Sequence, residues 1–117
     1  MASESALVSS SLDLTWRALR PWLADESVTE LCINRPGECF IESPSGWRRE
    51  ALPFADYDWC VRLAKLIANH THQRIDAASP LLSAALPTGE RVQIAMPPAC
   101  ESGTVAMSIR RPSTVRW

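Results

Sequence analysis

Arg91-Val-Gln-Ile-Ala-Met96 and Thr104-Val-Ala-Met-Ser-Ile-Arg110 are the two stretches of this sequence in which apolar side chains alternate most regularly. Such alternation is typical of strands that bury one face and expose the other, because successive side chains point to opposite sides of a strand. The residues between them, Pro97-Pro98-Ala-Cys-Glu-Ser-Gly103, are rich in turn formers. We therefore predict two antiparallel strands whose apolar faces consist of Val92, Ile94 and Met96, and of Val105, Met107 and Ile109.

This pairing brings two arginines together. An antiparallel register across the connection at 98–103 places Arg91 directly opposite Arg110, with both side chains on the face away from the apolar set. Arg111 falls on the other face if the strand stays regular that far. Two guanidinium groups across a ladder repel each other, so a carboxylate such as Glu90, solvent or a bound anion should compensate them. The planar fork of arginine suits phosphate, and the residues alone leave a solvated or Glu90-paired face and a phosphate site both open.

The middle of the chain predicts a strand meander followed by a helix. Strand-like segments at 29–34, 38–42 and 47–52 are separated by turn signals at Arg35-Pro36-Gly37 and Pro44-Ser45-Gly46. A helix starting near Asp56 follows, because apolar residues recur there at helical spacing. Its apolar face consists of Cys60, Leu63, Ala64 and Ile67.

The N-terminal segment predicts a second helix. Residues 1–11 are acidic and rich in Ser, and we expect a flexible tail there. From residue 12 an amphipathic helix should begin, and Pro21 should kink or end it. Its apolar face consists of Leu12, Trp16, Leu19 and Leu23. Residues 12–111 are thus expected to form one α+β domain: an antiparallel sheet with an N-terminal helix and a mid-chain helix.

The charge and the residue composition argue against several kinds of binding partner. The formal net charge is −1, which argues against a broad surface for nucleic acid or anionic lipid, although a local basic patch lies near the C-terminus. None of the four cysteines belongs to a CxxC pair, and His70 and His72 have no acidic or thiol neighbour at suitable spacing, so no metal site is predicted. No apolar run is long enough to span a membrane, and we expect free thiols and a cytosolic protein.

The chain also lacks the motifs of a complete active site. A P-loop needs a glycine-rich cradle followed by Lys and Ser or Thr. The single lysine, Lys65, lies in the predicted mid-chain helix and follows no glycine. No G-x-S-x-G sequence occurs either. We therefore predict no catalytic residue within these 117 residues.

Several blocks of the sequence, in order, resemble the VirB-type ATPases of type IV secretion and conjugation. They cover roughly residues 12–113, and pilus and type II secretion ATPases share a looser version of the pattern. The blocks are Leu19-Arg-Pro-Trp-Leu-Ala-Asp-Glu-Ser-Val-Thr-Glu-Leu-Cys-Ile-Asn-Arg-Pro-Gly-Glu38, Ile75-Asp-Ala-Ala-Ser-Pro-Leu-Leu-Ser-Ala-Ala-Leu-Pro-Thr-Gly-Glu-Arg-Val-Gln93, Pro97-Pro98 and Ser108-Ile-Arg-Arg-Pro-Ser113.

The resemblance implies a subunit of a hexameric double ring at the cytoplasmic face of the inner membrane, working with other type IV secretion components. The N-terminal ring would be a PAS-like α+β domain, and residues 112–117 would begin the linker to a RecA-like motor that this chain lacks. ATP and Mg²⁺ would lie between the two domains, and the fragment alone should hold neither tightly and be inactive. By motif position, Arg91 and Arg110, with Arg111 as the alternate, match the family's phosphate-contacting arginines.

Two other functions remain open at this stage. The domain could be a non-catalytic module that docks to secretion proteins or to the membrane surface, which the basic run from Arg110 to Arg116 and the tryptophans would suit. It could also be a small sensory PAS-like domain, although no residue for attaching a cofactor supports this. No specific nucleic-acid partner is expected.

Overall fold

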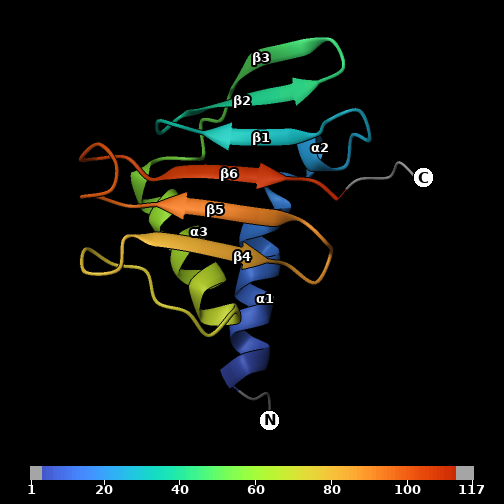
Figure 1. The fold of residues 1–117 in the computed structure, drawn as a ribbon. Coiled ribbons are helices and arrows are strands. Elements are labelled where there is room, and N and C mark those ends of the chain that lie inside the picture. Colours follow the sequence, from blue (N-terminus) through green and yellow to red (C-terminus); the bar gives the residue numbers. More distant parts are fainter. Residues whose placement is uncertain (1–3, 113–117) are drawn as a thin grey trace.

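A computed structural model describes residues 4–112, with side chains from residue 11 onward, as three helices and one six-stranded antiparallel sheet (Figure 1). The helices are α1 (Glu4–Arg17), α2 (Arg20–Leu23) and α3 (Tyr57–His70). The strands are β1 (Glu30–Ile33), β2 (Glu38–Ser43), β3 (Gly46–Ala51), β4 (Leu81–Ala85), β5 (Arg91–Ala95) and β6 (Ala106–Arg110). Their order in the sheet is β3-β2-β1-β6-β5-β4. The predicted α+β class, with one helix at the N-terminus and one in mid-chain, is confirmed.

The N-terminal helix begins earlier than the sequence predicts. We expected a flexible tail over residues 1–11, but α1 starts at Glu4, so the prediction is wrong for residues 4–11. That segment contains neither Gly nor Pro, so nothing stops the helix from extending toward the N-terminus. Residues 1–3 lie outside the described residues, as do residues 113–117 of the expected linker.

The break expected near Pro21 is confirmed. The helix α1 ends at Arg17, and Pro21 lies in the first turn of the short helix α2. A proline in that position loses no helical hydrogen bond, because the first N–H groups of a helix have no partner within it.

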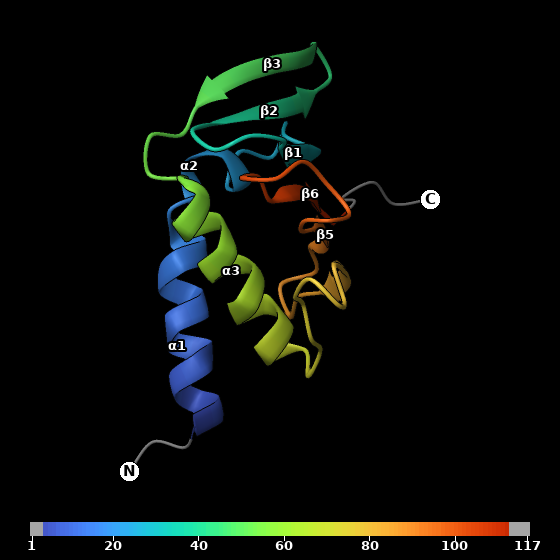
Figure 2. The same cartoon turned by 90° about the vertical axis from the view of Figure 1, so that its left-hand side faces the viewer.

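Both long helices cover the same face of the sheet (Figure 2). The Asp56 carboxylate caps α3 by accepting a hydrogen bond of 2.8 Å from the Trp59 N–H. The apolar face predicted for this helix is buried, namely Cys60, Leu63, Ala64 and Ile67. Each large side chain of this kind stabilises the fold by about 1.5–3 kcal/mol when it is fully buried. From the N-terminal segment, Leu12, Leu19 and Leu23 join the same core.

The five predicted strands are present, with ends within two residues of the predicted ones, and one further strand was not predicted. The meander over β1, β2 and β3 is confirmed, and Gly37 occupies its first turn with a φ of 86°, a conformation that favours glycine. The strand β4 was not predicted. Its sequence, Leu81-Leu-Ser-Ala-Ala85, has no clear alternation, and pairing with β5 is what makes it a strand.

Among residues 4–112, no helix covers the other face of the sheet (Figure 2). Side chains from alternate positions of all six strands lie on this face, which we call the open face. Because the sheet is antiparallel, side chains from neighbouring strands line up in rows that run across the strands. Such a row can bring together residues that are far apart in the sequence.

Candidate anion site

The predicted arginine pair is present on the open face. Arg91 of β5 lies opposite Arg110 of β6 in the sheet register. The next pair along, Val92 and Ile109, is buried against the helices, whereas both arginines are exposed. The register predicted from the connection at 98–103, and the face predicted from alternation, are therefore confirmed.

The two arginines belong to a longer row of cross-strand neighbours. Arg110 also lies opposite Glu30 of β1, and Glu30 lies opposite Glu42 of β2. The complete row across the six strands is Ala85, Arg91, Arg110, Glu30, Glu42 and Trp47. Two positive side chains thus stand next to two negative ones, and we call these four residues the charged row. Arg91 lies at its positive end, farthest from the carboxylates.

Glu30, and not Glu90, compensates Arg110. One guanidinium nitrogen of Arg110 (Nη2) lies 3.2 Å from Glu30 Oε1, and the side chains are 72% and 14% exposed respectively. Glu90 instead accepts a hydrogen bond from the Thr88 hydroxyl within its own turn. A carboxylate was one of the expected partners of the arginines, but it is Glu30 and not the suggested Glu90, because the sheet brings β1 next to β6. Within the described part of the chain, Arg91 forms no ion pair.

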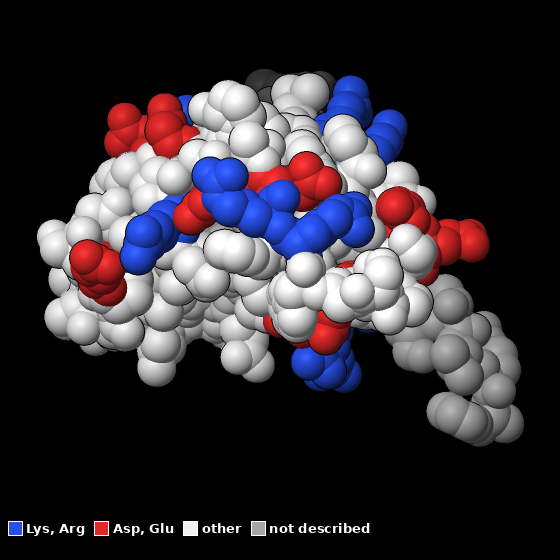
Figure 3. All heavy atoms as spheres, turned by 90° about the horizontal axis from the view of Figure 1, so that it is seen from above, with Lys and Arg blue, Asp and Glu red and all other residues white. Residues whose placement is uncertain are grey.

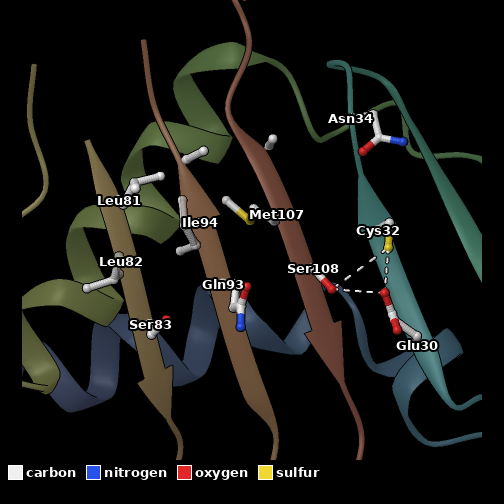
Figure 4. Close-up of a pocket in the computed structure, with 12 residues that line it drawn as sticks. Glu30, Cys32, Asn34, Leu81, Leu82, Ser83, Gln93, Ile94, Met107 and Ser108 are labelled. Atoms are coloured by element: carbon white, nitrogen blue, oxygen red, sulfur yellow. Dashed lines mark hydrogen bonds between the residues drawn. The ribbon is translucent and has the colours of Figure 1, made fainter. Parts of the chain in front are cut away.

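Glu30 is held by two further donors (Figure 4). The Ser108 hydroxyl donates to Glu30 Oε2 at 2.9 Å, and the Cys32 thiol donates to the same oxygen at 3.0 Å. The hydrogen bond from Cys32 is the main cause that lowers the pKa of Glu30, while partial burial acts in the opposite direction. The nearby Ser108 and Arg110 lower the pKa further. Glu30 is therefore charged at neutral pH.

Cys32 is not a nucleophile in this arrangement. Burial raises the pKa of its thiol to about 12, and the hydrogen bond to Glu30 and the charge of Glu30 act in the same direction. The thiolate is the reactive form of cysteine, so this side chain stays unreactive at neutral pH. All four cysteines of the chain are free, as expected.

Arg111 plays a different part from the pair. Its guanidinium Nη1 donates to the backbone oxygens of Asp25 at 2.6 Å and Val28 at 3.2 Å. Its own N–H donates to the Thr29 oxygen at 3.0 Å. These bonds fasten the end of β6 to the segment between α2 and β1. Arg111 is thus engaged with backbone carbonyls, and the geometry favours Arg91 and Arg110 as the anion-binding pair.

A shallow groove of about 360 Å³ lies next to the charged row on the open face (Figure 4). Its polar side is the adjacent row of cross-strand neighbours, formed by Ser83, Gln93, Ser108 and Cys32. Glu30, Cys32 and Ser108 were not predicted as site residues from the sequence. Their placement at alternate strand positions was a signal, but only the pairing of β1 with β6 shows that they meet.

The edge strand β3 carries a second group of charges. Figure 3, which looks down on this edge, shows Lys and Arg atoms in a band with Asp and Glu atoms beside them. Arg48 pairs with Glu50 at 3.0 Å, and Arg49 pairs with Glu38. The band is therefore largely neutralised by its neighbours and is a poor attractor for anions.

The described residues contain neither a cluster of metal ligands nor a helix that could cross a membrane. No three side chains of His, Cys, Asp or Glu lie close enough together there to hold a metal ion. Among the helices from α1 to α3, none has the length and apolar character that crossing a bilayer requires.

No protein-family model matches the chain, but individual relatives do. The type IV secretion system protein VirB11 of Brucella suis is 47% identical over 106 residues, which cover 91% of this chain and 29% of that protein. The type IV secretion system protein PtlH of Bordetella pertussis is 42% identical over 107 residues, covering 92% of this chain and 32% of that protein.

A solved structure agrees with these relatives. The crystal structure of the VirB11 ATPase from the Brucella suis type IV secretion system, in complex with sulphate, matches with a TM-score of 0.90 and 44% identity over 97% of this chain and 34% of that one. The chain thus spans about a third of the length of these proteins. Sequence and fold agree over nearly all of it, and the chain belongs to the VirB11 family of type IV secretion proteins, as an N-terminal domain of that family.

Proposed function

We propose that this domain is the N-terminal part of a type IV secretion ATPase and that Arg91 and Arg110 contact the phosphates of the bound nucleotide. The observation that carries the proposal is the arginine pair on the open face, in which Arg91 has no ion pair within the described residues. An arginine without a carboxylate partner keeps its donors available for an anion. ATP and Mg²⁺ would be held mainly by a segment of the longer protein, because this chain has no P-loop.

The arrangement suits phosphoryl transfer for a physical reason. Charge spreads over the oxygens of the transferred phosphoryl group, and positive groups fixed in advance stabilise that charge. Arg91 and Arg110 project from neighbouring strands of a sheet, which positions them more firmly than a loop would. Their contact with the terminal phosphate would also couple the nucleotide state to closure of this domain on the rest of the protein.

The assembly and location follow from family membership as part of the same proposal. The longer protein would be a hexamer, would act with other type IV secretion components and would lie in the cytoplasm at the surface of the inner membrane. Its work would be to energise substrate transfer or pilus assembly. The support for these statements is the similarity to VirB11 and PtlH, which are named as type IV secretion proteins.

The test is the rate of ATP hydrolysis by the longer protein with one arginine removed. Arg91→Ala and Arg110→Ala should each lower kcat by about 100-fold or more, since loss of one fixed donor to the transition state costs about that much. Arg49→Ala is the matched control, because Arg49 lies on the same sheet and pairs with Glu38 outside the charged row. Unchanged thermal unfolding would show that the variants are folded.

One alternative function has an observation in its favour. Trp47 on the edge strand β3 is 51% exposed, and an exposed aromatic side chain often marks a surface that binds another protein. The described part of the basic C-terminal run, Arg110 and Arg111, is engaged with Glu30 and with backbone oxygens, which weakens the case for a membrane surface. Near-normal turnover in both arginine variants would leave docking as the function of the domain.

A further inference from the structure

The charged row contains a carboxylate, Glu30, next to the arginine pair, and its negative charge affects how an anion can bind there. Glu30 lies directly across the ladder from Arg110, and its Oε1 accepts the hydrogen bond from Arg110. A phosphate that reaches Arg110 therefore meets a guanidinium that already has a partner. The inference that follows rests on the proposed phosphate-binding role of the arginines.

Glu30 is fixed more firmly than an ordinary surface carboxylate. Its second oxygen, Oε2, is held by Ser108 and Cys32, and its side chain is only 14% exposed. Arg110 is the less enclosed partner of the pair, because 72% of its side chain is exposed. If the pair opens, Arg110 is therefore the side chain with room to move.

We propose that Glu30 is a positioning residue that competes with phosphate for Arg110 and thereby sets how tightly the arginine pair holds the anion. In the absence of phosphate, the carboxylate keeps Arg110 turned away from Arg91 and balances its charge. When phosphate binds, Arg110 exchanges the carboxylate for phosphate oxygens, and the fixed negative charge beside the site favours release afterwards. Ser108 and Cys32 keep Glu30 from following Arg110.

A purely structural role for Glu30 predicts the opposite result from competition. If Glu30 only kept Arg110 in the correct place, removing its charge would loosen the arginine and weaken anion binding. If Glu30 competes, removing its charge strengthens binding. A unit charge a few ångströms from the anion, in a partly exposed site, is worth about threefold to tenfold in affinity at low salt. The direction of the change therefore decides between the two roles.

The experiment is a titration of the 117-residue chain with inorganic pyrophosphate, followed by the NMR signals of the Arg91 and Arg110 side-chain Nε–H groups, so that one arginine still reports on binding when the other is replaced. Glu30→Gln keeps the size of the side chain and removes the charge, and it should tighten the dissociation constant by about threefold to tenfold. Glu42→Gln is the matched control. Glu42 carries the same charge in the same row one strand farther from Arg110, and it bonds Thr29 instead, so its effect should stay below about twofold.

A double-mutant comparison separates this inference from the proposed function. If Glu30 acts mainly by competing for Arg110, most of the effect of Glu30→Gln should disappear in the Arg110→Ala background, and only the direct repulsion between Glu30 and the anion should remain. Weaker binding in Arg91→Ala and Arg110→Ala, together with unchanged or weaker binding in Glu30→Gln, would overturn the competition and leave the arginine site standing. Pyrophosphate binding that neither arginine variant weakens would overturn both.

A measurement on the unaltered chain covers the case in which Glu30→Gln does not fold. The side-chain carboxyl carbon of Glu30 should shift during the pyrophosphate titration, with the same midpoint as the Arg110 signal, because the carboxylate loses its guanidinium partner. A Glu30 carboxyl signal that stays constant while the Arg110 signal saturates would show that the pair does not open, and would overturn the inference.

Discussion

Glu30 has a positive neighbour on one side, Arg110 of β6, and a negative neighbour on the other, Glu42 of β2. Like charges directly opposite each other in a sheet destabilise it, so Glu30 and Arg110 relieve two repulsions at once: that between the arginines and that between the carboxylates. The Ser108 and Cys32 hydrogen bonds add to this by favouring the ionised form of Glu30. Arg91, the member of the row without a carboxylate neighbour across a ladder, is left as the point of highest positive charge.

The same contacts make a prediction about Cys32. Its pKa is raised from 9.0 to about 12, so the thiolate fraction at pH 8 should be about 1000-fold lower than that of an ordinary thiol. Alkylation of Cys32 by iodoacetamide should be slower by a similar factor than in the unfolded chain. The rate should keep rising up to pH 10 rather than levelling off above pH 9, and peptide mass spectrometry measures both. Rapid labelling of folded Cys32 at pH 8 would contradict the burial of its thiol and the hydrogen bond to Glu30.

At the scale of elements, the residues that follow β6 contact the turn between β4 and β5. Gly89, in the turn between β4 and β5, has a φ of 101°, and a Cβ added there would lie 3.2 Å from the Cβ and Cγ of Pro112. The Pro112 ring therefore packs against the backbone of Gly89, where there is no side chain. This contact joins the turn that precedes Arg91 to the residues that follow Arg110, and we call residues 111–112 the segment after β6.

Gly89→Ala should displace the segment after β6 without unfolding the domain. Its control is Gly46→Ala, since Gly46 has a similar φ of 105° but open space around the added Cβ. Both variants should lose about 1–2 kcal/mol of stability from backbone strain. Only Gly89→Ala should also displace Pro112, and hydrogen exchange of the neighbouring Arg111 amide, which bonds the Thr29 oxygen, should then accelerate. Equal exchange of that amide in both variants would show that the contact between Gly89 and Pro112 does not fix the position of the segment after β6.

The local sequence pattern was enough to predict pairs of strands that are neighbours in the sequence, such as β5 and β6. The register of β5 on β6 follows from the alternation together with the ten turn-rich residues between the two strands, which limit how the strands can pair. The partner of Arg110 could not be found in this way. Glu30 and Arg110 are 80 positions apart, and nothing local to β1 or β6 indicates that these strands pair. The strand β4 was missed for a related reason, because its pairing with β5 rather than its own pattern determines it.

At the scale of the whole molecule, the fold is one-sided. The helices α1 and α3 cover one face of the sheet, and the charged row and the groove lie on the other (Figures 1 and 2). This division places the arginine pair away from the core, since neither Arg91 nor Arg110 belongs to the buried cluster. It also means that the helices must hold to the sheet from one side alone, and α1 does so largely by packing on α3.

Two leucines of α1 test whether this helix is part of the cooperative core. Leu12 is 5% exposed within the core, whereas Leu14, two positions on, is 65% exposed. Leu12→Ala should lower the free energy of unfolding by about 2–4 kcal/mol, because it removes buried apolar atoms and leaves a cavity. Leu14→Ala should change it by less than about 0.5 kcal/mol. Urea unfolding measures both, and a constant slope with a shifted midpoint would show that α1 unfolds together with the sheet. Equal midpoints for the two variants would mean that α1 does not pack on the sheet domain in solution, and the helix would then contribute nothing to holding the arginine pair in place.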